Sequence, residues 1–188
     1  MDHPNYSQFY NLDGYLFNTV APRFHAQGFL SAFDFFCIVI WKANRAKSKI
    51  ARRLLAHSPG CFMEQAVCEL TSGIFLQPDA ETRMRYLWCD CGIRLPMASA
   101  ILTVLYPEEF TVYDYRVCDC MGKFHEIGVT SRFDKLWSNY TEFCQAVKNA
   151  TPKGLSLRDK DRYLWGKSFA EQLDHDLING FRRDTADE

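Results

Sequence analysis

Apolar residues recur along most of this chain at intervals of three and four positions, and stretches that alternate polar and apolar residues are nearly absent. The first pattern is typical of amphipathic helices and the second of strands, so strands are not expected. Helix starts are also marked, since Ser31 followed by Asp34 resembles a capping box, and Asp79 and Asp114 each precede a helical pattern. The sequence therefore predicts an all-α fold, a multi-helix orthogonal domain with short connections.

These helical patterns follow one another without an internal repeat, a low-complexity region or a linker. We therefore expect one helical domain over residues 1–188. The expected helices cover about residues 5–20, 31–43, 46–57, 62–75, 78–90, 96–105, 114–121, 137–150 and 157–177. In the last helix, Tyr163 and Trp165 are expected to pack against the rest of the domain. Its first basic residues are expected on a solvated face: Arg158, Lys160 and Arg162.

The composition suits a globular protein, because 47% of the residues are hydrophobic and 24% are charged. The first residues lack the basic cap and apolar run of a signal peptide. The longest uninterrupted apolar stretch, Phe35 to Trp41, is too short to cross a bilayer. We expect a soluble cytoplasmic protein that is monomeric and has no membrane partner.

Eight cysteines are present, and two Cys-Asp-Cys triplets lie at residues 89–91 and 118–120. We expect reduced, buried thiols, because a chain of this length folds without disulfides and several cysteines lie in apolar helical patterns. The alternative is a zinc-binding or redox protein that uses the four thiols of Cys89, Cys91, Cys118 and Cys120. Zinc sites more commonly have a C-x₂-C spacing, so no metal is expected.

The most informative segment spans about residues 84–105. A helix ends near Asp90, Gly92 permits a turn with positive φ, and a second helix begins at once with Pro96 in its first turn. Such a turn leaves backbone N–H groups unpaired at the positive end of the second helix, where they can hold a phosphate. An acidic residue, Asp114, opens a further helix 22 positions after Gly92.

This arrangement resembles the helix-hairpin-helix DNA glycosylase superfamily, which includes the endonuclease III, 8-oxoguanine and 3-methyladenine glycosylases. The resemblance covers residues 84–120 well and the remaining helices only loosely. It implies that Gly92 and Ile93 form a hairpin that grips the DNA backbone. Two small residues at the start of the next helix, Ala98 and Ser99, complete the DNA contact that the resemblance implies.

By position in that family, Asp114 matches the catalytic aspartate, and Arg116 matches a residue that contacts DNA phosphate in some members. Arg94 replaces the second hairpin glycine and offers a further phosphate contact. Pro96 stands where bifunctional members carry the lysine of their Schiff-base chemistry, so lyase activity is not expected. Only three cysteines follow Asp114, whereas members with an iron–sulfur cluster have four, so no cluster or other cofactor is expected.

Several of these residues have a structural interpretation beside the functional one. Asp114 is also a suitable plain N-cap for the helix that follows it. Its neighbours Tyr113 and Tyr115 line either a nucleobase pocket or the edge of the core. Trp41 and Lys42 end an apolar helix, and they form either a stacking platform with a cation beside a flipped base or a core tryptophan with a lysine that reaches solvent.

Charge is unevenly distributed, although the formal net charge is only −1. Residues 1–60 carry seven basic and three acidic side chains, and the segment from Trp41 to His57 contains no acid at all. Such a segment either faces phosphate or forms an ordinary solvated helix face. Four of its residues form what we term the basic strip: Lys47, Lys49, Arg52 and Arg53.

Together these features predict a monofunctional DNA N-glycosylase that excises a damaged or modified base and leaves an abasic site. The expected partner is DNA, either host DNA under repair or foreign DNA such as that of a phage. The runner-up is a DNA- or RNA-binding module that kept the hairpin without catalysis, and Arg94 and Pro96 are the residues that favour it. A zinc-binding or redox protein is the third alternative.

Overall fold

The computed structural model describes residues 6–181, and every regular element among them is helical, as predicted. The α-helices are α1 (Leu12–Tyr15), α2 (Ala21–Gln27), α3 (Ala32–Ala43), α4 (Lys47–His57), α5 (Met63–Phe75), α6 (Ala80–Arg85), α7 (Leu95–Leu105), α8 (Tyr115–Met121), α9 (Phe133–Asn149) and α10 (Leu157–Ile178). Two π-helical segments, η2 (Leu16–Val20) and η4 (Tyr86–Asp90), join α1 to α2 and extend α6. Single 3₁₀ turns lie at Tyr6–Phe9, Asn44–Ala46 and His125–Val129.

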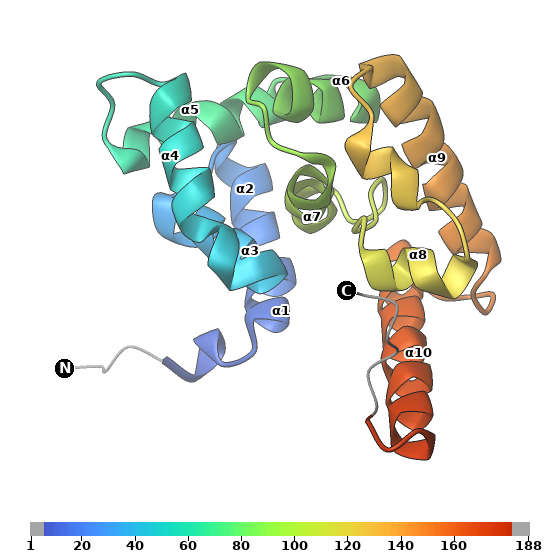
Figure 1. Cartoon of the computed structure of the whole chain (residues 1–188). Coiled ribbons are helices and arrows are strands. Elements are labelled where there is room, and N and C mark those ends of the chain that lie inside the picture. Colours follow the sequence, from blue (N-terminus) through green and yellow to red (C-terminus); the bar gives the residue numbers. More distant parts are fainter. Residues whose placement is uncertain (1–5, 182–188) are drawn as a thin grey trace.

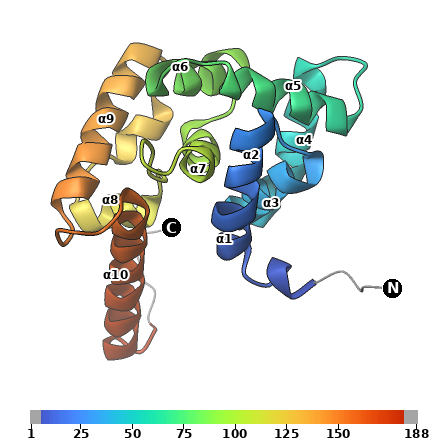
Figure 2. The same cartoon turned by 180° about the vertical axis from the view of Figure 1, so that it is seen from behind.

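Helix α7 lies in the middle of the molecule, with α1–α5 on one side and α8–α10 on the other (Figure 1). Helix α6 runs across the top of this arrangement between the two sides, as both views show (Figure 2). Residues from Met97 to Leu105 of α7 are all buried. A helix that is apolar on all sides belongs inside a fold, which explains why the other helices pack around this one.

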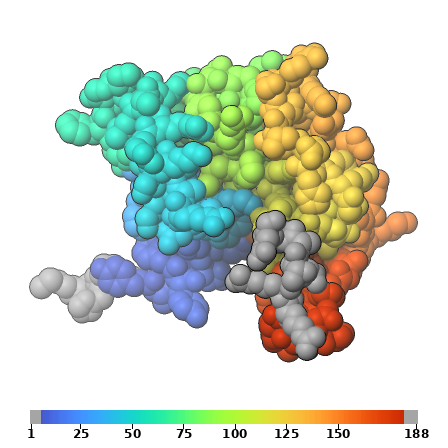
Figure 3. Space-filling model, in the orientation of Figure 1, coloured from blue at the N-terminus to red at the C-terminus, as the bar shows by residue number. Residues whose placement is uncertain are grey.

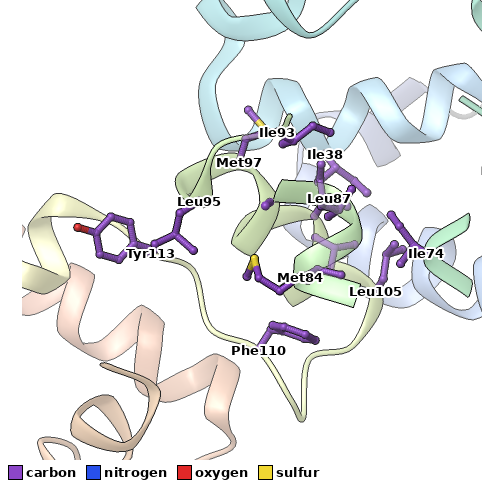
Figure 4. Close-up of a cluster of buried hydrophobic side chains, with 14 of the residues drawn as sticks. Ile38, Ile74, Met84, Leu87, Ile93, Leu95, Met97, Leu105, Phe110 and Tyr113 are labelled. Atoms are coloured by element: carbon purple, nitrogen blue, oxygen red, sulfur yellow. The ribbon is translucent and has the colours of Figure 1, made fainter. Parts of the chain in front are cut away.

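The core around α7 is continuous, since one cluster of buried side chains extends from Tyr15 to Leu164. Figure 4 shows Met97 of α7 and Ile93 of the preceding turn beside Ile38 of α3. The two buried hydroxyl-bearing residues of α7 bond to its own backbone, because Thr103 donates to the Ser99 carbonyl at 2.7 Å and Ser99 to the Pro96 carbonyl at 3.3 Å. The polar atoms within this apolar helix are therefore satisfied.

Several predicted helix starts are confirmed by their caps. Ser31 accepts the Asp34 N–H at 3.1 Å, and Asp79 forms a complete capping box with Thr82. The capping box predicted at Ser31 is only half formed, because the Asp34 carboxylate accepts the Tyr15 hydroxyl at 2.6 Å instead of returning to the N-cap. Local sequence therefore determines where these helices begin, while tertiary contacts decide how the acidic side chain is used.

Two predicted boundaries differ from the structure. The helix expected over residues 5–20 begins only after the N-cap Asn11, and it continues through η2 and α2 until Gly28, whose φ is 82°. Helix α9 begins at Phe133, four residues before the expected start at 137. Phe133 and Leu136 are buried, so packing extends the helix beyond its most regular part.

Helix α10 is the longest element, with 22 residues, and its C-terminal part projects beyond the other helices (Figure 1). Charged side chains occur along its whole length. Within residues 6–181, no helix has both the length and the apolar character needed to span a membrane.

Candidate active site

A pocket of about 420 Å³ opens between the end of α3 and the start of α10, beside the loop that precedes α8. Its volume falls in the range of roughly 300–1,000 Å³ that is usual for small-molecule sites. In the space-filling view, the cyan surface of α3 and α4 lies on the left, the yellow surface of α8 lies on the right, and the red surface of α10 lies at the bottom (Figure 3). Three segments distant in sequence line the pocket, with the residues Trp41, Lys42, Val112, Asp114, Arg158, Asp161, Arg162 and Trp165.

Lys42 and Asp114 form an ion pair in this pocket, with 2.5 Å between Lys42 Nζ and Asp114 Oδ2. The two side chains are 12% and 18% exposed, so water screens the pair only weakly. The other carboxylate oxygen, Oδ1, accepts the Arg116 N–H at 3.1 Å and caps α8. Asp114 is therefore an N-cap, and the same carboxylate also lines a pocket beside a cation.

The loop before α8 turns Tyr113 and Asp114 in opposite directions. Its backbone is extended at Asp114, with φ −135° and ψ 141°, and successive side chains of extended backbone point to opposite sides. The Tyr113 ring is buried against Phe143, and its hydroxyl donates to the Phe124 carbonyl at 2.8 Å. Tyr115 is 61% exposed and outside the pocket lining. Neither tyrosine therefore lines the pocket, and the core-edge alternative describes Tyr113.

Two tryptophans form the aromatic part of the pocket. Trp41 lines it beside Lys42, but the Arg158 guanidinium lies 5.0 Å from the Trp41 ring centroid and covers part of that ring. Trp165 is 45% exposed, and it stacks on Phe169 with ring centroids 5.9 Å apart and an interplanar angle of 4°. Trp165 thus packs against the domain only in part, and it is the more accessible aromatic wall of the pocket.

A second set of charged side chains at the pocket is centred on Arg158. Arg158 donates from Nη1 to Asp161 Oδ2 at 2.5 Å and from Nη2 to Asp13 Oδ1 at 2.6 Å. The Asp161 side chain is only 6% exposed. Burial raises the Asp161 pKa to about 6, against the opposing effect of the Arg158 and Lys42 charges. The solvated face predicted for Arg158 is wrong, because its side chain is 15% exposed and holds two carboxylates.

Other predicted positions lie at the rim of the pocket. Arg162 lines the pocket with 58% of its side chain exposed, in agreement with the predicted solvated face. Lys160 is instead tied to backbone, because its ammonium donates to the Lys148 carbonyl at 2.9 Å. Arg116 donates to Gln172 at 2.7 Å, and its guanidinium lies 5.4 Å from the Trp165 ring centroid. Arg116 therefore lies next to the accessible tryptophan.

The turn predicted to grip DNA has the expected backbone form. Gly92 has a φ of 63°, a left-handed conformation that favours glycine, and α7 begins at Leu95. Arg94 is exposed and gives α7 no side-chain cap. The Met97 and Ala98 N–H groups donate to the Arg94 carbonyl at 3.0 and 2.9 Å, and Pro96 has no N–H, so the first turn offers a ligand only the Leu95 N–H. Arg53 donates a hydrogen bond to the Gly92 carbonyl, which connects the basic strip to this turn.

Three residues predicted to contact DNA have side chains that lie in the core. Ile93 and Ala98 are 1% and 0% exposed and pack against apolar neighbours. Ser99 is also fully buried, and its hydroxyl accepts the Tyr113 N–H at 2.9 Å. Direct contacts through these three side chains are excluded, because no DNA can reach them. Ser99 instead anchors the loop that carries Asp114.

The basic strip is largely on the surface. Lys47, Lys49 and Arg52 are exposed, while Arg53 is half-buried at the Gly92 turn. Lys47 donates to Asn44 at 3.0 Å, and Arg52 to the Ser48 carbonyl at 3.4 Å. None of the strip's four cations forms an ion pair with an acidic side chain within residues 6–181.

The two Cys-Asp-Cys triplets do not form a common site. Cys91 lies 4.0 Å from His57, whereas Cys120 donates to the Leu164 carbonyl at 3.2 Å. In the described part of the chain, no group of three or more histidine, cysteine or acidic side chains is arranged to hold a metal. The zinc alternative has no support, and all eight cysteines are unpaired with one another.

The contribution of Asp161 on α10 to the pocket was not predicted from the sequence. Asp161 lies four residues after Leu157 and three before Leu164, both of which are buried. An acid at that spacing lies on the apolar face of the helix, where a carboxylate is rarely found without a cationic partner. The sequence could have indicated a buried ion pair here, because Arg158 lies one turn before Asp161.

No known protein family, curated protein or solved structure matches this chain. The resemblance to helix-hairpin-helix glycosylases accordingly depends on the residues and spacing of segment 84–120, and it stays a prediction.

Proposed function

We propose that this protein is a DNA N-glycosylase without lyase activity, which removes a damaged or modified base and leaves an abasic site. The observation that supports it best is the position of Asp114. The hairpin spacing singles out this residue as the catalytic aspartate, and its carboxylate lies in a pocket with an aromatic wall and a buried cation. An N-cap with a purely structural role needs no such pocket.

The chemistry requires little beyond what the pocket contains. When the bond between C1′ of the sugar and the base nitrogen breaks, its electron pair leaves with the base and the sugar becomes an oxocarbenium-like cation. A carboxylate beside that cation stabilises it and orients the attacking water, which is the role we assign to Asp114. Lys42 holds the carboxylate in place through their contact.

DNA binding is assigned to the surface around the Gly92 turn. The Leu95 N–H at the start of α7 and the exposed Arg94 side chain offer donors to a phosphate. The basic strip adds cations on an adjoining helix, since Arg53 connects α4 to the turn. Trp165 is the surface on which an extruded base can stack.

Lyase activity is not expected, because it requires a free amine that attacks C1′ of the sugar. Pro96 occupies the position of the family's nucleophilic lysine and has no amine. Lys42 is in the pocket, but its ammonium is paired with Asp114 and carries no free electron pair for attack on C1′. Borohydride reduction during turnover is expected to trap no protein–DNA adduct. An adduct lost in Lys42→Gln would show that the protein is bifunctional.

The test of the function itself is direct. The protein is incubated with duplex oligonucleotides that carry a panel of damaged and naturally modified bases, and free base and abasic sites are measured. Release of at least one base by the parent, and none by Asp114→Asn, is the expected result. If the parent releases no base from any duplex that it binds, the proposed activity is wrong.

The same panel tests the second candidate, a DNA- or RNA-binding module without catalysis. The observation that favours it is the ion pair itself, because Lys42 and an N-cap bond already occupy both oxygens of Asp114. A module of this kind binds duplexes with a strong salt dependence and leaves every base in place.

A further inference from the structure

Two mostly buried carboxylates, Asp114 and Asp161, line the pocket together with the cations Lys42, Arg158 and Arg162. Lys42 is paired with Asp114, and Arg158 is shared between Asp13 and Asp161. Arg162 also lines the pocket, but it is mostly exposed and belongs to a separate pair with Asp159. Arg158 thus divides its two terminal nitrogens between Asp161 in the pocket and Asp13 outside the pocket lining.

Of the two carboxylates that line the pocket, Asp161 is the one expected to bind a proton. Its side chain is 6% exposed, compared with 18% for Asp114 and 31% for Asp13, so water stabilises its ionised form least. Burial raises its pKa to about 6. The charged or titratable groups that interact with it from other elements are Lys42 of α3, Asp114 of the loop before α8, and Tyr140 of α9, and on α10 itself Arg158.

One oxygen of Asp161 is available to a ligand. Arg158 holds Oδ2, whereas Oδ1 has no hydrogen-bond partner in the described part of the chain. Oδ1 is also not one of the fully buried polar atoms that lack a partner within residues 6–181, so it retains some accessible surface. Since Asp161 lines the pocket, a proton on Oδ1 lies where a bound base can receive it.

We propose that Asp161 is the general acid of the glycosylase reaction, which gives its proton to the departing base while Asp114 stabilises the sugar. This inference rests on the proposed function and extends it to the substrate. A neutral base needs a proton or a strong hydrogen bond to accept the electron pair of the broken bond. A cationic base, such as a ring-methylated purine, leaves as a neutral molecule without one. The pocket is therefore built for neutral bases.

The step balances as a hydrolysis. The C1′–N bond breaks, its electron pair goes to the base, and the Asp161 proton moves to a ring nitrogen or carbonyl oxygen of the base. Water adds to C1′ and releases a proton to Asp114 and then to solvent. Asp161, now ionised beside Arg158, takes a proton from solvent before the next turnover.

The experiment compares the parent with Asp161→Asn on two duplexes, one with a neutral base that the parent releases and one with 7-methylguanine, which is cationic. Asparagine keeps the shape and can donate a hydrogen bond, but it cannot transfer a proton. Single-turnover release of the neutral base should fall by about 100-fold at pH 6. The parent rate should decline as pH rises above 6, and the variant profile should be flat. Release of 7-methylguanine, where the parent shows any, should change less than threefold.

Asp174→Asn is the matched control, because Asp174 is an exposed residue of the same helix outside the pocket. A carboxyl NMR titration of the parent without DNA should place the Asp161 transition near pH 6. If Asp161→Asn keeps the parent rate and pH profile while Asp114→Asn is inactive, the general acid is wrong and the glycosylase function stands. If the parent releases no base at all, both fail.

Discussion

Arg53 of α4 donates a hydrogen bond to the carbonyl oxygen of Gly92, the residue whose positive φ makes the turn before α7. This contact joins two surfaces that the sequence presented separately, the basic strip and the hairpin. It also gives Arg53 a structural role that Lys47, Lys49 and Arg52 lack. Variants of the strip are therefore best divided into those that keep Arg53 and those that remove it.

Gly92→Ala should weaken DNA binding, and Gly122→Ala is its control. Both glycines have left-handed backbone, with φ of 63° and 62°, so an added Cβ strains each by about 1–2 kcal/mol. Neither is crowded, because the nearest atoms to a Cβ at Gly92 are those of Arg53 at 3.9 Å and none lies within 4 Å at Gly122. If both variants lose the same Tm and only Gly92→Ala binds DNA more weakly, DNA contacts the Gly92 turn. If both variants bind DNA equally well, the turn is not part of the DNA-binding surface.

The triple variant of Lys47, Lys49 and Arg52 to Gln should bind DNA more weakly with a flatter salt dependence. Each lost phosphate contact lowers the slope of log K against log salt by about 0.9. A control triple at Lys135, Lys148 and Lys153 removes equal charge from exposed positions outside the strip. The measurement is a set of binding isotherms at several salt concentrations. If the isotherms of the strip variant coincide with those of the control triple, the basic strip does not contact DNA.

Arg53→Gln should behave differently from the triple variant. It removes the hydrogen bond to the Gly92 carbonyl as well as a charge, so both Tm and DNA affinity should fall. Arg52→Gln, one residue away and exposed, is the matched control for the charge. If the two variants have the same Tm, the contact with Gly92 contributes nothing to stability.

Asp114→Asn should lower base release by at least about 100-fold, because a neutral amide does not stabilise the sugar cation. Asparagine still caps a helix, so α8 should persist by circular dichroism. A moderate loss of Tm is expected, since Lys42 is 12% exposed and loses its anion. Asp119→Asn, an exposed change in the same helix, should keep full activity. Full activity in Asp114→Asn would leave this residue only its N-cap role.

Asp161 should make stability depend on pH in a defined direction. Its pKa of about 6 lies above the ordinary value of 3.8, so the folded protein binds this proton more tightly than the unfolded chain. The resulting stabilisation is full below about pH 4 and is lost as pH rises through 6. Asp161→Asn removes that dependence, so its stability relative to the parent should rise by up to about 3 kcal/mol between pH 4 and 7.5. Denaturant unfolding across this range measures the difference, and a constant difference contradicts the shift.

The sequence alone determined the helical class and the starts of several helices. Apolar spacing determined the all-α class, and local capping by Ser31, Asp79 and Asp114 determined where helices begin, because these bonds span only two or three residues. The positive φ of Gly92 was likewise predictable, since few other residues adopt it. Trp41, Lys42 and Asp114 were also singled out, and they do line one pocket.

Only the tertiary structure decided which side chains meet. The direction of Tyr113 depends on an extended loop held by Ser99, and no local pattern specifies that bond over 14 residues. The pairing of Arg158 with Asp13 joins positions 145 residues apart, so it depends on where the packing of α10 against α8 and α9 places Arg158. Burial of Asp161 arises from the same packing. The proton affinity of that carboxylate is a property of the folded pocket, because desolvation and the shared guanidinium exist only there.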